Sequence, residues 1–400
     1  MLLTRSPAAP MRPHRVETEN ALVRNSTPIA VCAPNAFKGT LSARAAAAAM
    51  ARGVRDAGAE AVEIPVADGG DGTLDVLLSA RGAASRSTRH RVTGPYGASL
   101  SARLGWIGPT DAVVELAEAS GLRRVVGGDP DALRATSRGT GELIAAALAA
   151  GARTIIVGVG GSACTDGGAG LLQALGARLI DAQGVDIGTG GAGLVDIAHI
   201  DLSRVVASLQ GCRVEVACDI RSPLLGTEGA ARMFAPQKGA RPDEVQALEA
   251  ALAHFASLAA QTGGPDLSLL PGAGAAGGCG FGLALIGARL VAGAALVCDV
   301  VGLDQALGAA SLVITGEGRL DSQTSTGKAP AEVARRARAH GLPCVAIAGT
   351  VADHIGETFD ATIALDQQES ELDPRRHARR LLRLAARQAM LEFLGARRTR

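Results

Sequence analysis

Short apolar runs alternate with amphipathic stretches at both ends of this 400-residue chain. Four apolar, β-branched runs predict buried parallel strands, at residues 29–32, 62–66, 312–315 and 344–348. Helical patterns follow two of them, at about 42–56 with Ser42 as a possible cap, and at 328–340 with Pro330 in the first turn. In such β-loop-α units the carboxyl ends of the strands and the helix N-termini face a ligand crevice.

The middle of the chain has a different pattern. From about residue 89 the apolar runs are short and alternate with polar residues, as in RVTGPYGASLSARLGWIG, which is typical of hairpins. We therefore predict a two-domain α/β protein. Parallel strands from both ends share one sheet in a discontinuous domain, residues 29–88 and 271–395, and residues 89–270 form an inserted mixed α/β domain. A basic helix at 373–394 packs through its leucine stripe.

Composition excludes several classes of partner. The net charge is +1 and aromatic residues make up 2% of the chain, so neither a strong field nor stacking side chains favour nucleic acid. The longest apolar tract, 281–301, is interrupted by charges and glycines and is not a membrane span. Seven scattered cysteines without a CxxC pair indicate reduced thiols in a cytoplasmic protein. Residues 1–28 lack an apolar core and are predicted to be a disordered extension rather than a secretion signal.

The loop after the strand at 312–315 concentrates charge. Glu317, Arg319 and Asp321 lie within it, and Lys328 stands where the next helix begins. Two carboxylates, a guanidinium and an ammonium at a strand end suggest chemistry rather than packing. The alternative is a solvated loop with a capping acid.

Lysine is rare in this chain. Among 40 Lys and Arg residues only Lys38, Lys238 and Lys328 are lysines, and all three lie in glycine-bearing loops. An ammonium beside exposed backbone amides can hold phosphate or carboxylate, and a planar guanidinium does not replace it. The alternative is that these are three chance residues.

Other strand ends also carry acids. The segment ADGGDGT places Asp68 and Asp71 among glycines after the strand at 62–66, which suits Mg²⁺ or a polar substrate. A turn before an acidic helix N-terminus is the alternative. Asp219 ends the strand predicted at 214–220.

A glycine-rich stretch, GVGGSACTDGG, follows the strand predicted at 154–157. Gly158, Gly160 and Ala163 satisfy the dinucleotide fingerprint, which leaves a nicotinamide-dependent dehydrogenase as the alternative function. The run at 272–277 also matches, so the fingerprint is weak in so glycine-rich a chain. Asp166 would repel a pyrophosphate, and serine, threonine and aspartate among glycines fit a metal–phosphate or polyol site better.

The chemistry that remains is phosphoryl transfer. The sequence signals no Ser–His–Asp arrangement, and its histidines have no metal-ligand spacing. The segment from Gly318 to Lys328 is not a Walker A loop, because its spacing is wrong and Ala329 replaces the hydroxyl residue. Glycine loops, lysines and strand-end carboxylates are what phosphate binding, Mg²⁺ binding and proton acceptance require.

Six ordered motifs carry a resemblance that covers roughly residues 29–390: APNAFKGTLSA, PVADGGDGT, GVGGSACTDGGAGLLQALGA, CDIRSPLLGTEGAARMFAPQKGA, GAGAAGGCGFGL and VITGEGRLDSQTSTGKAPAEVA. Together they resemble the bacterial glycerate kinase family. The resemblance implies an α/β fold of two domains, the discontinuous one having a parallel Rossmann/flavodoxin-like sheet. It also implies that ATP phosphorylates D-glycerate with Mg²⁺, with 2-phosphoglycerate favoured over 3-phosphoglycerate, in a monomer or homodimer.

Expected roles follow from the resemblance and the residue types. Lys38 and Lys328 neutralise the transferring phosphate, and either Asp166 or Asp321 accepts the hydroxyl proton. Lys238 holds the glycerate carboxylate or a phosphate. The candidate Mg²⁺ ligands are Asp68, Asp71 and Glu317. The remaining substrate- and phosphate-binding candidates are Gly160, Gly161, Ser162, Asp219 and Arg319. Asn35 and Ala36 stand where the family pattern has an aspartate and a serine, so no acid or metal role falls to that loop.

Overall fold

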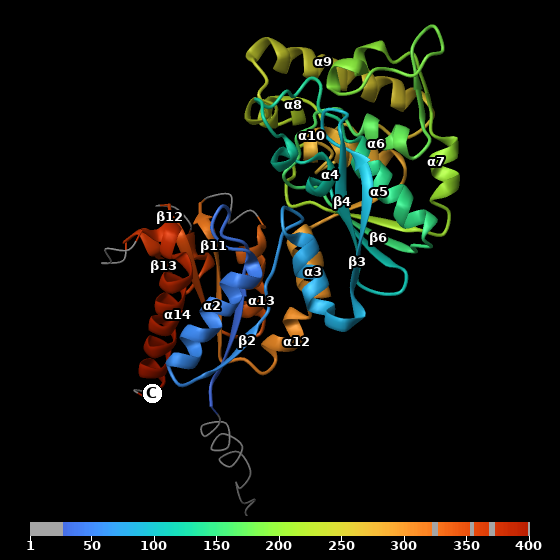
Figure 1. Ribbon diagram of the computed structural model, residues 1–400. Coiled ribbons are helices and arrows are strands. Elements are labelled where there is room, and N and C mark those ends of the chain that lie inside the picture. Colours follow the sequence, from blue (N-terminus) through green and yellow to red (C-terminus); the bar gives the residue numbers. More distant parts are fainter. Residues whose placement is uncertain (1–26, 322–326, 353–355, 368–372, 399–400) are drawn as a thin grey trace, which may run out of the picture.

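The first of two large sheets combines strands from both ends of the chain (Figure 1). The computed structural model describes residues 27–321, 327–352, 356–367 and 373–398. This sheet is parallel throughout, in the order β13-β12-β11-β1-β2. Its strands are β1 (Ile29–Pro34), β2 (Glu60–Glu63), β11 (Leu312–Leu320), β12 (Cys344–Val351) and β13 (Ala361–Ala364). The middle strands are covered on both faces, which explains why their sequences are continuous apolar runs rather than alternating ones.

Helices cover both faces of this sheet. One face packs against α2 (Ala43–Asp56) and α14 (Pro374–Arg398). The other packs against α11 (Gly293–Val300), α12 (Leu303–Leu307) and α13 (Ala329–Ala339). Ser42 caps α2 as predicted, since its hydroxyl oxygen accepts from the amide of Ala45. The basic helix is confirmed as a packed helix, with Leu381 and Leu382 buried.

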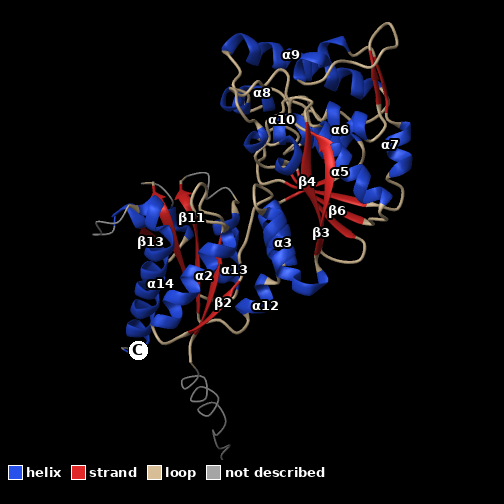
Figure 2. Ribbon diagram, in the orientation of Figure 1, coloured by secondary structure: helices blue, strands red, loops and turns tan. Residues whose placement is uncertain are grey.

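The second sheet is mixed, in the order β10-β9-β6-β5-β4-β3 (Figure 2). Its strands are β3 (Arg86–Thr93), β4 (Ser99–Trp106), β5 (Asp111–Glu115), β6 (Thr154–Gly158), β9 (Arg213–Ala217) and β10 (Arg289–Val291). The β3–β4 and β4–β5 pairs are antiparallel, as the alternating pattern predicts, and the other pairs are parallel. A separate antiparallel pair joins β7 (Arg178–Ile180) and β8 (His199–Asp201).

The helices of this part enclose one large apolar core with the second sheet. They are α4 (Ala117–Ser120), α5 (Arg138–Ala149), α6 (Ala169–Ala174), α7 (Ser203–Ser208), α8 (Ala230–Phe234), α9 (Pro242–Gln261) and α10 (Ala275–Leu285). Phe255 of α9 meets Phe281 of α10 edge to face, with ring centroids 5.5 Å apart. The amphipathic helix α9 therefore packs its apolar side on this core.

The α/β class and the parallel sheet shared by the two ends of the chain are confirmed. The sheets nevertheless divide the chain differently from the predicted boundaries at 89 and 270. Strand β10 pairs with β9, and α10 contributes to the second core, so residues 275–291 pack with the second sheet. Helix α3 (Thr73–Arg81) also packs on that sheet, through Leu74 and Leu77. A strand–helix pattern looks the same whichever sheet it joins, so the sequence could not assign these segments.

The segment between β2 and α3 crosses from one part to the other. Its ladder bonds continue beside β1, from the Val66 amide to the Pro34 carbonyl, and it then passes over the ends of β6 and β9. A Cβ atom on Gly69 would lie 2.2 Å from the carbonyl oxygen of Ala217, and one on Gly158 would lie 2.8 Å from that of Gly69. The carboxyl ends of strands from both sheets therefore meet at this segment.

No helix within the described ranges is long and apolar enough to cross a membrane. All seven cysteines are free thiols, as predicted. The extension predicted at residues 1–28 lies almost wholly outside the described residues, as do positions 322–326 of the loop before α13.

Candidate functional site

Two loops of the first sheet bring together the charged residues of its carboxyl edge. The amide of Asn35, after β1, donates to the carbonyl of Gly316 in β11, and the chain at Gly318 passes close to the amide of Lys38. Lys38 is exposed at this edge. The Arg319 guanidinium lies 3.5 Å from a carboxylate oxygen of Asp321. The β1 and β11 loops therefore form one charged rim.

Lys328 and Glu317 belong to the same edge. Lys328 is the N-cap residue of α13, so its side chain starts where the free amides of that helix point. Glu317 is 9% exposed within β11. The sequence predicted Glu317 and Arg319 in a loop after the strand and Lys328 at the start of the next helix. Strand β11 instead extends to Leu320 and includes Glu317 and Arg319, and the structure adds the β1 loop beside them.

A cavity of about 1250 Å³ opens beside this rim. The β1–α2 loop with Lys38 forms one wall, and α3 with Asp75 and Val76 forms another. Ile64 and Val66 contribute apolar surface between them. A cavity of this size, lined by both charged and apolar side chains, is large enough for a nucleotide.

Asp68 and Asp219 come together from distant parts of the chain. Asp68 accepts hydrogen bonds from the Asn35 side chain and the Gly70 amide, both at 3.2 Å. Asp219 accepts from the amide of Ala294, in the first turn of α11, at 3.0 Å. Burial, and then the charge of Asp68, raise the pKa of the Asp219 carboxyl to about 7. Asp68 therefore lies close enough to Asp219 to act on its charge, where the two sheets meet.

Asp71 belongs to an ionic network that the sequence analysis missed. The Arg123 guanidinium lies 3.6 Å from Asp71, 3.0 Å from Glu115 and 2.9 Å from Glu118. Glu115 also accepts from the amides of Gly72 and Leu74, at 3.1 and 3.0 Å, so it caps α3 from the second sheet. Burial raises the pKa of Glu115. The available sequence signal for this network was Glu115, an acid at the end of the apolar run of β5.

Asp166 has a different environment from that of a general base. Its side chain is fully buried. Its oxygens accept from the amide and hydroxyl of Ser137, at 2.7 and 2.8 Å, and from the amides of Gly168 and Gly170, at 3.1 and 3.3 Å. These bonds anchor the loop between β6 and α6. Because a substrate hydroxyl cannot reach this carboxylate, we do not propose it as the proton acceptor.

Lys238 is also buried, with 2% of its surface exposed. Its ammonium donates to the hydroxyl oxygen of Ser162 at 2.9 Å and to the carbonyl of Cys164 at 2.5 Å. Burial lowers the pKa of this ammonium. The predicted direct contact with glycerate is untested, but protein acceptors occupy two of its N–H groups.

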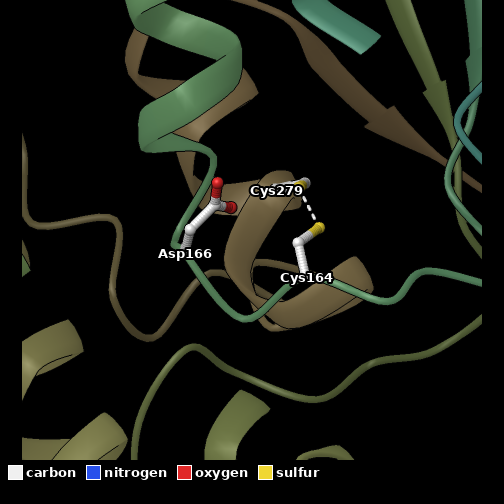
Figure 3. A group of neighbouring side chains, drawn as sticks. All are labelled: Cys164, Asp166 and Cys279. Atoms are coloured by element: carbon white, nitrogen blue, oxygen red, sulfur yellow. Dashed lines mark hydrogen bonds between the residues drawn. The ribbon is translucent and has the colours of Figure 1, made fainter. Parts of the chain in front are cut away.

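Figure 3 shows Cys164, Asp166 and Cys279, with the two sulfur atoms facing each other. The sulfur atoms are 3.7 Å apart, and all three groups act on the pKa of the Lys238 ammonium. Among the described residues these three form the one group whose metal-ligand atoms all lie within 4.8 Å of one another. The site does not suit a cation. The Asp166 oxygens already hold backbone donors, and the Lys238 ammonium is near enough to act on all three groups.

The predicted metal ligands Asp68, Asp71 and Glu317 do not form such a preassembled group. Mg²⁺ commonly binds one or two carboxylates together with phosphate oxygens and water, so convergence of three carboxylates is not required for it. The role of these residues stays a prediction.

The nicotinamide alternative finds no support. A dinucleotide fingerprint needs a helix that starts within the glycine turn, but α6 begins only at Ala169, well beyond Ala163. Gly158 and Gly160 instead face the crossing segment, and Gly277 of the second match packs on the Cys164 carbonyl. Gly160 and Gly161 thus have packing contacts, and a direct phosphate contact for either residue is untested.

Comparisons with known proteins agree with one another. The profile of the glycerate kinase family matches residues 30–393. The chain is 44% identical over 330 residues to "Glycerate 2-kinase" of Escherichia coli, covering 82% of this chain and 86% of that protein. It is 45% identical over 325 residues to "Glycerate kinase" of Bacillus subtilis, covering 80% and 85%.

A solved structure gives the same result in three dimensions. The crystal structure of a "putative glycerate kinase 2" from Salmonella typhimurium LT2 superposes with a TM-score of 0.81 and 42% identity, over 93% of this chain and all of that one. The chain therefore belongs to the glycerate kinase family and is a phosphotransferase with ATP as a substrate.

Proposed function

We propose that this protein transfers the γ-phosphate of ATP to the 2-hydroxyl of D-glycerate. The observation that carries the proposal is the 44% identity, over most of both chains, to the E. coli protein named glycerate 2-kinase. The cleft between the two parts supports it, because a cavity with charged and apolar lining adjoins the charged rim there. Phosphate and base are the two portions of ATP that such surfaces suit.

The triphosphate lies along the rim of the first sheet in this proposal. Lys38 and Lys328 neutralise charge on the transferring phosphoryl group, and Arg319 binds a phosphate oxygen. Preorganised cations are most effective at the transition state, when the charge spreads over the phosphoryl oxygens. Exposure of Lys38 and the N-cap position of Lys328 leave both side chains accessible to a phosphate.

Magnesium fits the donor set of this edge. Asp68, Asp71 and Glu317 offer carboxylate oxygens, which are the protein ligands that Mg²⁺ prefers. The mutual repulsion of Asp68 and Asp219 leaves negative charge there that a cation would relieve. Asp68, Asp71 and Glu317 would hold the ion, which supplies charge neutralisation to the phosphates when bound.

Glycerate lies at the second sheet in this proposal, beside the loop at Gly160, Gly161 and Ser162. Asp219 contacts a substrate hydroxyl. Asp321 accepts the proton of the reacting hydroxyl, since Asp166 is enclosed by donors of its own loop. Asp321 is half-buried and stands beside Arg319 on the rim.

Phosphorus NMR of the product tests the position of transfer. Purified protein is incubated with D-glycerate, ATP and Mg²⁺, and the proton-coupled spectrum is recorded. A phosphate on C2 couples to one carbon-bound proton and gives a doublet, whereas a phosphate on C3 couples to two and gives a triplet. A triplet would contradict the regiochemistry, and the absence of ADP release would contradict the activity.

Metal removal tests the Mg²⁺ assignment. We expect turnover to vanish in excess EDTA and to return when Mg²⁺ is added. Titration of the same protein with NAD⁺ should show no binding. Full turnover in EDTA would remove the metal role from Asp68, Asp71 and Glu317.

A further inference from the structure

Lys238 is a buried cation whose hydrogen bonds go to a hydroxyl and a carbonyl oxygen, and the buried Asp166 carboxylate is close enough to act on it but forms no ion pair with it. Arg336, buried to a similar degree, has ion pairs with Glu332 and Asp299, both at 2.7 Å. No ion pair within the described part of the chain includes Lys238. Burying a charge that no carboxylate contacts directly is expensive, so a lysine at such a position calls for a reason other than stability.

The position of the Lys238 ammonium makes the Ser162 hydroxyl oxygen a hydrogen-bond acceptor. Lys238 is the last residue of the short turn Pro236–Lys238, and its side chain reaches the loop after β6 from the protein interior. An ammonium has only protons to offer, so the Ser162 oxygen is the acceptor in their 2.9 Å hydrogen bond. The hydroxyl proton of Ser162 must therefore point elsewhere. Within the described residues, no hydrogen bond uses this hydroxyl as a donor.

The loop itself is held firmly. The amide of Ala163 donates to the carbonyl of Ser120, and the amide of Leu122 donates to the carbonyl of Gly161, both at 2.9 Å. On its other side, a Cβ on Gly161 would lie 3.0 Å from a carboxylate oxygen of Asp71. Ser162 is thus fixed beside the meeting point of the two sheets, with 6% of its surface exposed.

We propose that Lys238 is a positioning residue that acts through Ser162. Its ammonium holds the Ser162 oxygen as an acceptor and so directs the hydroxyl proton toward an oxyanion of the substrates, either the glycerate carboxylate or the transferring phosphoryl group. The bound anion also compensates the buried positive charge. This inference rests on the proposed function and changes the contact expected of Lys238 from direct to relayed.

A double-mutant cycle tests the relay. Ser162→Ala, Lys238→Met and the double variant are prepared in the full chain, and kcat and KM are measured with each substrate varied. Each single variant should lose about 10- to 100-fold in kcat/KM, as expected when a hydrogen bond to a charged group is removed. The kcat/KM of the double variant should be no lower than that of the less active single variant, because both changes break the same relay.

The kinetic constants identify the oxyanion. A raised KM for glycerate with unchanged kcat indicates the carboxylate, and a lowered kcat or a raised KM for ATP indicates the phosphoryl group. Two controls separate the relay from structural damage. Ser268→Ala changes a serine with the same 6% exposure, and Arg336→Met removes a buried charge. Both should keep wild-type kinetic constants, the second with a lower melting temperature.

Multiplicative effects in the double variant would overturn the proposal, and so would wild-type constants for Ser162→Ala. If Lys238→Met does not fold, the kinetics of Ser162→Ala decide alone. Failure of the proposed function is distinct, because the wild-type protein would then not phosphorylate D-glycerate. In that case calorimetric titrations with ATP and with D-glycerate compare wild type and Ser162→Ala. Equal affinities for both would overturn the relay.

Discussion

Gly160 offers a sharp test of how the two parts meet. A Cβ at this position would lie 2.4 Å from the Cα atom of Gly70 and 3.3 Å from the carbonyl oxygen of Gly69. The Gly160 amide donates to that same oxygen at 2.9 Å. Its φ angle is not positive, so alanine fits the backbone conformation and the effect of Gly160→Ala is purely steric.

The size of the effect follows from the overlap. The contact must open from 2.4 Å to more than 3.0 Å, and the neighbour is backbone, which cannot rotate away. Overpacking of this kind lowers the free energy of unfolding by about 1–3 kcal/mol. The segment that moves carries Asp68 and Asp71. Misplacement of catalytic groups by about 1 Å can lower turnover about 100-fold, so we expect a loss of roughly 10- to 100-fold in kcat.

The assay compares kcat, KM and melting temperature for Gly160→Ala and for a control, Gly188→Ala. A Cβ on Gly188 meets no atom within 4 Å, and its φ is not positive, so this variant should behave as wild type. If Gly160 instead serves close approach of a phosphate, alanine should lower activity at an unchanged melting temperature. That result, or wild-type activity and stability, would refute the packing argument.

Three further predictions concern other contacts. Alanine normally stabilises a helix relative to glycine by up to about 1 kcal/mol, but a Cβ on Gly53 in α2 would lie 2.0 Å from the carbonyl oxygen of Arg383 in α14. Gly53→Ala should therefore lower the free energy of unfolding in urea by about 2 kcal/mol. Gly395→Ala should not lower it, because a Cβ there meets no atom within 4 Å. Equal effects of the two variants would contradict the close contact between α2 and α14. Glu115→Gln should lower the free energy of unfolding by about 2 kcal/mol, because the buried carboxylate accepts a hydrogen bond from Arg123 and caps α3. Glu63→Gln, which changes an exposed ion pair, should lower it by less than about 1 kcal/mol. Similar unfolding midpoints for the two variants would argue against the cap. Lys328→Arg should lower kcat about 100-fold at an unchanged melting temperature, and wild-type turnover would mean that a compact ammonium is not required there.

Much of the fold was determined by local sequence alone. Continuous apolar runs predicted the buried parallel strands, and the alternating residues after 89 predicted the antiparallel β3–β4 pair. The cap at Ser42 and Pro330 in the first turn of α13 were also correct. These features depend on residues within one element, so periodicity and capping chemistry are sufficient to reveal them.

The sequence also predicted that most residues of the charged rim lie together. Glu317, Arg319, Asp321 and Lys328 are close in the chain, and a strand end followed by a helix brings them to one edge of a sheet. Six motifs in order were enough to indicate the family, which the comparisons confirm.

Only the tertiary structure decided which polar residues are buried. Asp166 was a candidate catalytic base in a glycine-rich loop, yet the amide and hydroxyl of Ser137, from a distant segment, donate to its carboxylate. Lys238 resembled a substrate contact but lies beneath Ser162. The Arg123 network depends on acids from three elements, and β10 joined the second sheet through its pairing with β9. Long-range pairing and burial depend on which segments meet in space, and local periodicity does not contain that information.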